Sequence, residues 1–151
     1  MAASLGLTAY RALARRGEAR LPVFDAPRPK GELLWIHCAE AGSYIAVQDL
    51  ALRQIASRPG LNVLISMATL PRESGPEGGP RPAGVYITEI CEDHPASVAA
   101  FLDYWAPDCC VWTWGGLRPN LILLAAERQC PLFLINADTA GFDGRRDRWL
   151  P

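Results

Sequence analysis

Short apolar runs alternate with longer amphipathic segments over most of the chain. Each apolar run has the length of a strand and is bounded by glycine, proline or polar residues. Because these runs are mostly continuous, we expect both faces of the strands to be buried, as in a parallel sheet covered by helices. The predicted strands are residues 33–38, 61–67, 85–88, 109–112 and 132–135, and the predicted helices are residues 43–57, 94–106 and 119–128.

This alternation predicts an α/β fold, namely a Rossmann-like three-layer domain with a parallel sheet of about five strands. Ligands bind such sheets outside the carboxyl ends of the strands, so the candidate chemistry should gather there. The turn at residues 37–43 leads into a helix, whose first N–H groups can bind an anion. We expect Gly42 or Ser43 to cap that helix, and both to offer N–H groups to a phosphate or hydroxyl.

Two further segments carry local signals. Residues 71–84 contain four prolines and four glycines. This composition excludes a helix or a central strand and indicates an exposed, mobile loop. Asp93 precedes His94-Pro95 and is the expected N-cap of the helix that begins there.

The chain ahead of the sheet divides into a helix and a connector. Residues 1–20 are expected to form an amphipathic helix with Leu5 and Leu13 on one face. Residues 21–32 contain three prolines and should form an extended connector, and the Rossmann-like domain then spans residues 33–151. We favour packing of the helix on this domain or on another domain over contact with a membrane surface.

Charge and cysteine content narrow the classes of function. Fifteen basic residues nearly balance sixteen acidic ones, so the overall charge gives no reason to expect nucleic acid binding. Arginines gather locally at 11–20 and 145–148, on faces that are either solvated or in contact with anionic partners. The five cysteines include no C-x-x-C pair, which argues for a reducing compartment and against a disulfide framework or a metal site. No apolar run approaches the roughly 20 residues that span a bilayer.

Common cofactor and nucleophile motifs are missing from the sequence. There is no G-x-G-x-x-G after the first strand, no P-loop and no G-x-S-x-G, which argues against dinucleotide and hydrolase chemistry. His37 and Cys38 are neighbours on a strand and should point to opposite faces, so a Cys–His dyad is not expected. A strand-end histidine such as His37 is more often bonded to backbone.

Most of residues 33–137 resembles one family. Trp35-Ile36-His37, followed by Gly42, resembles the W-I-H-A-x-S-x-G-E motif of the 3-deoxy-D-manno-octulosonic acid (Kdo) transferase family. Further similarities to its N-terminal domain follow in order. His94-Pro95 to Pro107-Asp108 resembles the segment before the fourth strand, Leu117 with Pro119-Asn120 resembles E-T-E-L-W-P-N, and Pro131 to Asn136-Ala137 resembles I-P-x-x-L-V-N-A-R.

The resemblance implies one half of a GT-B glycosyltransferase, in which two Rossmann-like domains face each other across a cleft. In this family the N-terminal domain binds the lipid acceptor and the C-terminal domain binds the donor CMP-Kdo. The family adds Kdo to lipid A, in lipopolysaccharide biosynthesis, at the inner face of the bacterial inner membrane. The resemblance therefore implies no cofactor in this chain. It implies a lipid A-type acceptor or anionic glycolipid as partner, and a donor domain in cis if the natural chain is longer. It also implies a cytoplasmic location, peripheral to that membrane.

The chain departs from the family at its acidic positions. The family glutamate taken to be the catalytic base corresponds to Ser43, and the two glutamates of E-T-E-L-W-P-N correspond to Trp114 and Gly116. The arginine of N-A-R corresponds to Asp138. A serine hydroxyl is too weak a base to replace a carboxylate near neutral pH. Glu40, in the same turn, is either a relocated base or a solvated loop carboxylate.

Two functions remain open at this point. The chain is either an acceptor-binding domain with impaired transfer or a catalytically inactive binding module that keeps the fold. Trp112 and Trp114 should be unusually exposed and line a sugar or partner surface, or else pack in the core and turn. The substrate-binding residues implied by the resemblance are His37, Gly42, Ser43, Gly116, Asn120 and Asn136.

Overall fold

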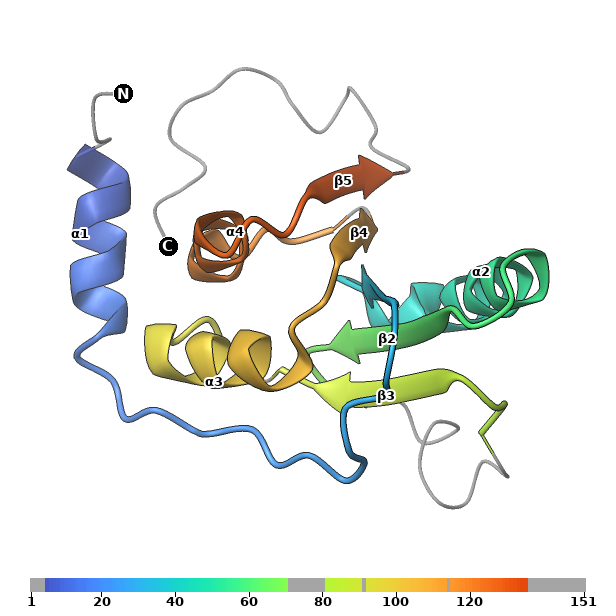
Figure 1. Ribbon diagram of the computed structural model, residues 1–151. Helices are drawn as coiled ribbons and strands as arrows, with labels where there is room; N and C mark the ends of the chain where they lie inside the picture. The colour runs from blue at the N-terminus through green and yellow to red at the C-terminus, as the bar shows by residue number, and fades with distance from the viewer. Residues whose placement is uncertain (1–4, 71–80, 91, 114, 136–151) are drawn as a thin grey trace.

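A computed structural model describes residues 5–70, 81–90, 92–113 and 115–135. Strands and helices alternate along the chain in the expected order (Figure 1). The elements are α1 (Leu5–Ala14), β1 (Leu33–His37), the 3-10 turn η1 (Ala41–Ser43), α2 (Tyr44–Ser57), β2 (Asn62–Met67), β3 (Val85–Glu89), α3 (Pro95–Trp105), β4 (Cys109–Thr113), α4 (Pro119–Glu127) and β5 (Leu132–Ile135).

The five strands form one all-parallel sheet in the order β3-β2-β1-β4-β5. β1 is central and pairs with β2 on one side and with β4 on the other. The chain winds from β1 toward β3 and then crosses to β4 and β5, so the strand order reverses between β1 and β4. This is the switch point at which doubly wound folds bind ligands. The predicted Rossmann-like α/β fold is confirmed.

Helices on the two faces of the sheet build two separate hydrophobic cores. α3 and α4 cover one face, which buries Trp35, Trp105 and Trp112. α2 covers the other face, mainly through Tyr44 and Val47 packed over β1, β2 and β3. Successive residues of a strand point to opposite faces, which explains how continuous apolar strands supply both cores.

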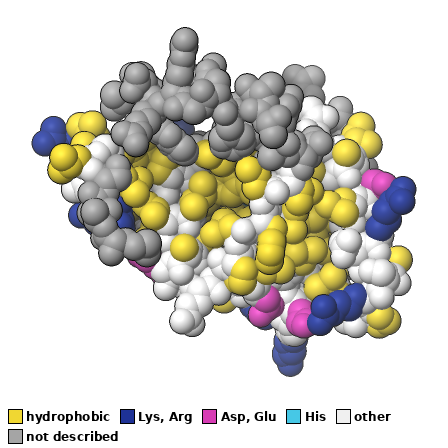
Figure 2. All heavy atoms as spheres, turned by 90° about the horizontal axis from the view of Figure 1, so that it is seen from above, with side chains coloured by type: hydrophobic (Ala, Val, Ile, Leu, Met, Phe, Trp, Pro, Cys, Tyr) yellow, Lys and Arg dark blue, Asp and Glu magenta, His cyan; other side chains and the backbone are white. Residues whose placement is uncertain are grey.

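The α2 face is covered less completely than the sequence predicts. Phe133 and Ile135 of β5 lie in register with Val111 and Thr113 of β4 and share that face. Phe133 is 57% exposed and Ile135 is 37% exposed. Figure 2, which looks down from the β5 side, shows hydrophobic side chains gathered at the surface. The expectation of burial on both faces is therefore wrong for β5, at least against the described part of the chain.

The N-terminal helix packs on its own domain, but not through the expected face. The Tyr10 hydroxyl donates a 2.9 Å hydrogen bond to Asp93 Oδ2. Leu5 and Leu13, in contrast, are 87% and 62% exposed. The residues after α1 run as an irregular connector beneath α3 toward β1 (Figure 1).

Two helix starts differ from the sequence-based expectation. The N-cap of α3 is His94, whose Nδ1 accepts the Ala96 N–H at 3.1 Å. Asp93 reaches α4 instead, where its carboxylate accepts the N–H groups of Asn120 at 2.8 Å and Leu121 at 2.9 Å. The free N–H groups and positive dipole end of α4 attract a carboxylate from a neighbouring loop, and local sequence does not reveal such a long-range cap.

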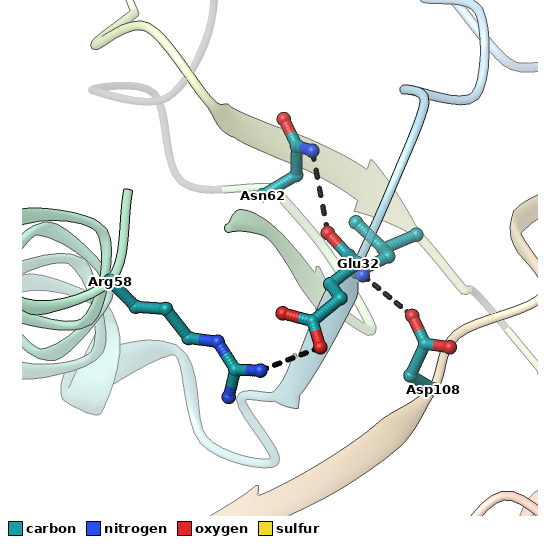
Figure 3. A network of polar contacts seen from close by, with 5 residues as sticks. Glu32, Arg58, Asn62 and Asp108 are labelled. Carbon is teal, nitrogen blue, oxygen red and sulfur yellow. Dashed lines mark hydrogen bonds and ion pairs between the residues drawn. The ribbon is translucent and has the colours of Figure 1, made fainter. Parts of the chain in front are cut away.

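Polar contacts close the amino end of the sheet (Figure 3). Asp108 accepts the N–H of Leu33 at 2.7 Å, and the Glu32 carboxylate accepts from Arg58 at 2.6 Å. The Glu32 carbonyl oxygen also accepts from Asn62 Nδ2 at 3.3 Å. This network lies at the edge opposite the carboxyl ends of the strands, so we assign it to stability.

Candidate functional site

The turn after β1 is tied to the end of β4 at the switch point. The Thr113 hydroxyl donates to the His37 carbonyl oxygen at 3.1 Å and accepts the Ala39 N–H at 3.2 Å. The Cys38 thiol donates to the Glu40 carbonyl oxygen at 3.1 Å. Burial raises the pKa of this thiol, so it stays protonated and is not a nucleophile at neutral pH.

The turn after β4 approaches the same place through Gly115. A Cβ added at Gly115 would lie 2.7 Å from the Ala39 Cβ and 3.0 Å from the Glu40 Cγ. Its φ of +147° is also a conformation that other residues rarely adopt. Glycine at this position therefore allows the two turns to come into contact.

A hollow of about 250 Å³ lies beside these turns, between α2 and the ends of β4 and β5. Both predicted catalytic candidates, Glu40 and Ser43, line it. The hollow has a polar rim and an apolar wall, and it is slightly smaller than a typical small-molecule pocket. The other residues that line it are Ala46, Val47, Leu50, Thr113 and Ile135.

Among the described residues that line the hollow, Glu40 is the one ionisable residue. Glu40 is exposed to solvent. A carboxylate in this position can take a proton from a hydroxyl group that enters the hollow. The Ser43 hydroxyl can only donate or accept a hydrogen bond there.

The predicted anion site at the start of α2 is largely closed by the backbone. Residues 41–43 wind as η1, in which the Ser43 N–H donates to the Glu40 carbonyl oxygen at 3.0 Å. The Tyr44 N–H donates to the Ala41 carbonyl oxygen, and the Ser43 side chain makes no capping hydrogen bond. The expectation that Ser43 offers its N–H to a ligand is therefore wrong. Gly42 is exposed, and a Cβ added to it would meet no atom within 4 Å.

His37 lies on the α3–α4 face of the sheet, away from the hollow. His37 is 1% exposed, and the centroid of its ring lies 4.2 Å from that of the Trp112 ring. His37 Nδ1 lies 2.8 Å from the Ser66 Oγ, which also accepts the Trp35 Nε1–H at 2.7 Å. The Ser66 proton can then be donated to a neutral imidazole. The expected bond to backbone is wrong, because the partner of the ring is a side chain.

The pKa of His37 follows from this environment. Burial, together with the charge of Arg118, lowers it to about 3. The ring is therefore neutral across the physiological range and cannot provide a positive charge to an anionic substrate.

The other residues implied by the family resemblance are spread over different places. Asn120 is buried in the first turn of α4, where its Nδ2 donates to the Asp93 carbonyl oxygen at 2.7 Å. Gly116 is exposed at the rim of the switch point. Asn136 lies outside the described residues. The structure thus brings Glu40 and Ser43 together and places His37 and Asn120 in the α3–α4 layer.

Of the two alternatives for Trp112, the exposed surface is wrong and packing in the core is confirmed. This residue is 2% exposed, in the core under α3 and α4. Trp114 lies outside the described residues. No exposed tryptophan surface for a sugar or partner is therefore found in the described part of the chain.

Sequence reasoning missed two residues that shape the site. Thr113 ties the two turns together, and Gly115 permits their contact. A polar β-branched residue at the end of an apolar strand, with glycine two residues later, is a signal that could have identified them. The signal becomes specific only when the strand order places β4 beside β1.

Two other kinds of feature are absent from the residues that the structure describes. No group of three or more histidine, cysteine or acidic side chains could hold a metal ion. Within the same ranges, none of the helices has the length and apolar character required to cross a membrane.

Comparisons with known proteins identify the family. A family model described as 3-deoxy-D-manno-octulosonic-acid transferase (kdotransferase) matches residues 12–146. No curated protein matches the sequence. Among solved structures, the Bordetella bronchiseptica enzyme WbmH in complex with NAD+ matches at 17% identity and a TM-score of 0.41, over 65% of this chain and 36% of that chain.

The family match and the fold agree. The matched residues include every strand of the sheet and both turns that meet at the switch point. The family supports a glycosyltransferase-like role for the domain. The chain belongs to the 3-deoxy-D-manno-octulosonic-acid transferase family, of which it carries the N-terminal glycosyltransferase domain.

Proposed function

We propose that this domain binds the acceptor of a Kdo-type sugar transfer and that its catalytic capacity is impaired. The observation that carries the proposal is the hollow of about 250 Å³ lined by both Glu40 and Ser43. It has room for a hydroxyl-bearing part of an acceptor, beside the position at which the family keeps its base.

The impairment follows from the side chain at position 43. Transfer requires a base that removes the proton of the acceptor hydroxyl as this attacks the anomeric carbon. A positioned general base contributes roughly 10²–10⁴-fold to the rate. The hydroxyl of Ser43 cannot take this role, and within the described part of the lining Glu40 is the one carboxylate. We assign any residual transfer to Glu40.

The partners follow from the family. We propose a lipid A-type or other anionic glycolipid as acceptor, and CMP-Kdo as a donor that binds a second domain. The exposed Leu5 and Leu13 of α1, with basic residues beside them, suit a peripheral position at the inner face of the bacterial inner membrane.

The test uses the natural gene product, supplied with CMP-Kdo and a lipid A precursor. Substitution Ser43→Glu restores the carboxylate of the family, and Ser43→Gln is its uncharged control. We expect Kdo addition to rise about 10²-fold or more with Ser43→Glu and to stay unchanged with Ser43→Gln. Glu40→Gln should abolish the residual turnover of the unmodified protein.

Acceptor binding separates the two possible functions. Retained binding of the lipid A precursor, with no turnover in the unmodified protein or in Ser43→Glu, would show an inactive binding module. Loss of both binding and turnover in a folded protein would reject the assignment of the hollow as the acceptor site.

A further inference from the structure

The outer edge of β3 offers unpaired backbone groups. β3 is the terminal strand of the sheet. Gly84 and Ile90, on either side of β3 in the chain, bond to β2, so even-numbered residues here direct their backbone groups toward β2. In a parallel strand the intervening residues direct theirs to the opposite side. Ile87 and Glu89 therefore present N–H donors and C=O acceptors at an open edge.

A cavity of about 380 Å³ lies along this edge. It is lined by Ile87 and Glu89 of β3, by Trp105 of α3 and by residues of the connector between Arg20 and Ala26. Figure 1 shows the connector passing the outer edge of β3, on the far side of the sheet from β5. The cavity is therefore separate from the acceptor hollow, which lies beside β4 and β5.

Three contacts hold the connector away from the strand edge. The Arg20 N–H donates to Glu92 Oε1 at 2.7 Å, and the Phe24 ring stacks on Tyr104 with centroids 3.9 Å apart. The Tyr104 hydroxyl then donates to the Ala26 carbonyl oxygen at 2.9 Å. Among the described residues, no backbone hydrogen bond joins this part of the connector to β3. The connector is thus a wall of the cavity, and none of the described residues pairs with the outer edge of β3.

Two features of the cavity indicate what it would bind. The Trp105 Nε1–H is buried and has no acceptor in the part of the chain that the structure describes. A peptide carbonyl oxygen can accept from it only if the indole turns toward the ligand. Among the described residues that line the cavity, Asp25 and Glu89 supply two carboxylates against the single guanidinium of Arg20, which favours a cationic ligand.

We propose that this cavity binds a short extended peptide with a basic side chain, taken from another protein, as an added strand on β3. Its backbone pairs with Ile87 and Glu89, which is the established physical mode of β-strand addition. The basic side chain is balanced by Asp25 and Glu89. This interaction is independent of the acceptor hollow and of the sugar-transfer function proposed above.

The test is an NMR titration of the full 151-residue chain with the acetylated and amidated peptide Val-Thr-Lys-Thr-Val. We expect amide hydrogen exchange at Ile87 and Glu89 to slow at least tenfold at millimolar peptide, and the Trp105 indole N–H resonance to shift. The control peptide is methylated at every backbone nitrogen, which keeps the side chains but removes the donors. It should produce neither effect.

Two variants add an independent readout. Glu89→Lys should weaken binding of the lysine peptide by about two- to fivefold, whereas Asp49→Lys on α2 should leave it unchanged. Ile87→Pro removes one outward N–H, and with it the packing of the Ile87 side chain in the α2 core, and should weaken binding by roughly three- to tenfold. If Ile87→Pro fails to fold, the comparison of Glu89→Lys with Asp49→Lys still tests whether the lysine peptide binds at this edge.

Three results would overturn the proposal. One is unchanged exchange at Ile87 and Glu89 with millimolar peptide. Another is an equal response to the methylated peptide. The third is protection that rises with protein concentration in the absence of peptide, which would identify a second copy of the chain as the occupant.

Discussion

The Tyr10 hydroxyl donates a 2.9 Å hydrogen bond to Asp93, the residue whose carboxylate also caps α4. Burial, together with this carboxylate, raises the pKa of Tyr10 to about 12, so the phenol remains a donor at neutral pH. One carboxylate therefore joins the N-terminal helix to the start of α4. Its two roles can be separated by substitution.

Asp93→Ala should destabilise the domain by about 1–3 kcal/mol, because it leaves the N–H groups of Asn120 and Leu121 without their acceptor. Tyr10→Phe removes only the contact with α1 and should cost about 0.5–1.5 kcal/mol. Urea denaturation followed by circular dichroism measures both. Equal losses in the two variants would show that the cap of α4 contributes nothing.

Gly115→Ala should disturb the contact between the two turns at the switch point. The added Cβ would lie 2.7 Å from the Ala39 Cβ at a positive φ, so we expect a loss of roughly 1–3 kcal/mol in the free energy of unfolding. Gly116→Ala is the matched control, because its Cβ would meet no atom within 4 Å. Thermal denaturation of both variants checks the difference, which disappears if the turns are not in contact.

His37 should make the stability of the domain depend on pH. The folded state keeps the ring neutral, because its pKa is lowered to about 3, whereas the unfolded state binds a proton below about pH 6.5. The neutral His37 ring therefore makes its full contribution to the free energy of unfolding above pH 6.5. This contribution declines as the pH falls toward 3. We expect a loss of about 2 kcal/mol between pH 7 and pH 5.

Urea denaturation at a series of pH values measures this loss. His37→Gln should remove the contribution, so that its stability changes less between pH 7 and pH 5. His94→Gln, which changes the only other histidine, should retain it. An unchanged pH dependence in His37→Gln would contradict the neutral, buried ring.

Ser66→Ala should cost about 2–3 kcal/mol, because it leaves the Trp35 indole N–H and the His37 ring without their shared partner. Ser57→Ala, at the exposed end of α2, should change stability by less than about 0.5 kcal/mol. Chemical denaturation at pH 7 compares the two. Similar values would mean that the buried hydroxyl is not needed for packing of the α3–α4 layer.

The sequence predicted the layers of the fold because apolar runs and helical periodicity are local patterns. All five strands lie within a residue or two of their predicted limits. The pairing of Glu40 with Ser43 was also predictable, since both lie in one turn. Contacts that depend on the order of the strands in the sheet could not be predicted from the sequence. The sequence does not show that Thr113 binds the turn after β1, or that His37 turns toward Ser66.

The prediction of Asp93 as the N-cap of α3 was wrong for a related reason. Asp93 is a residue type that favours N-caps and histidine is not, yet His94 occupies the N-cap position directly before Pro95. The Asp93 carboxylate caps α4 instead, because the first N–H groups of α4 lie within hydrogen-bonding distance of it. The sequence also did not show that, among the described residues, α2 is the one helix on its face of the sheet, because β5 is as apolar in sequence as the buried strand β2.

The distribution of tryptophans also governs how unfolding of this domain can be observed. Among the described residues, all three indoles lie in the α3–α4 core, and the α2 core contains none. Intrinsic fluorescence from these indoles therefore reports on one layer of the protein. If α2 separates from the sheet before the remainder, the emission of these three indoles will stay constant while far-ultraviolet ellipticity falls. Noncoincident transitions from the two probes would show that the layers do not unfold as one cooperative unit.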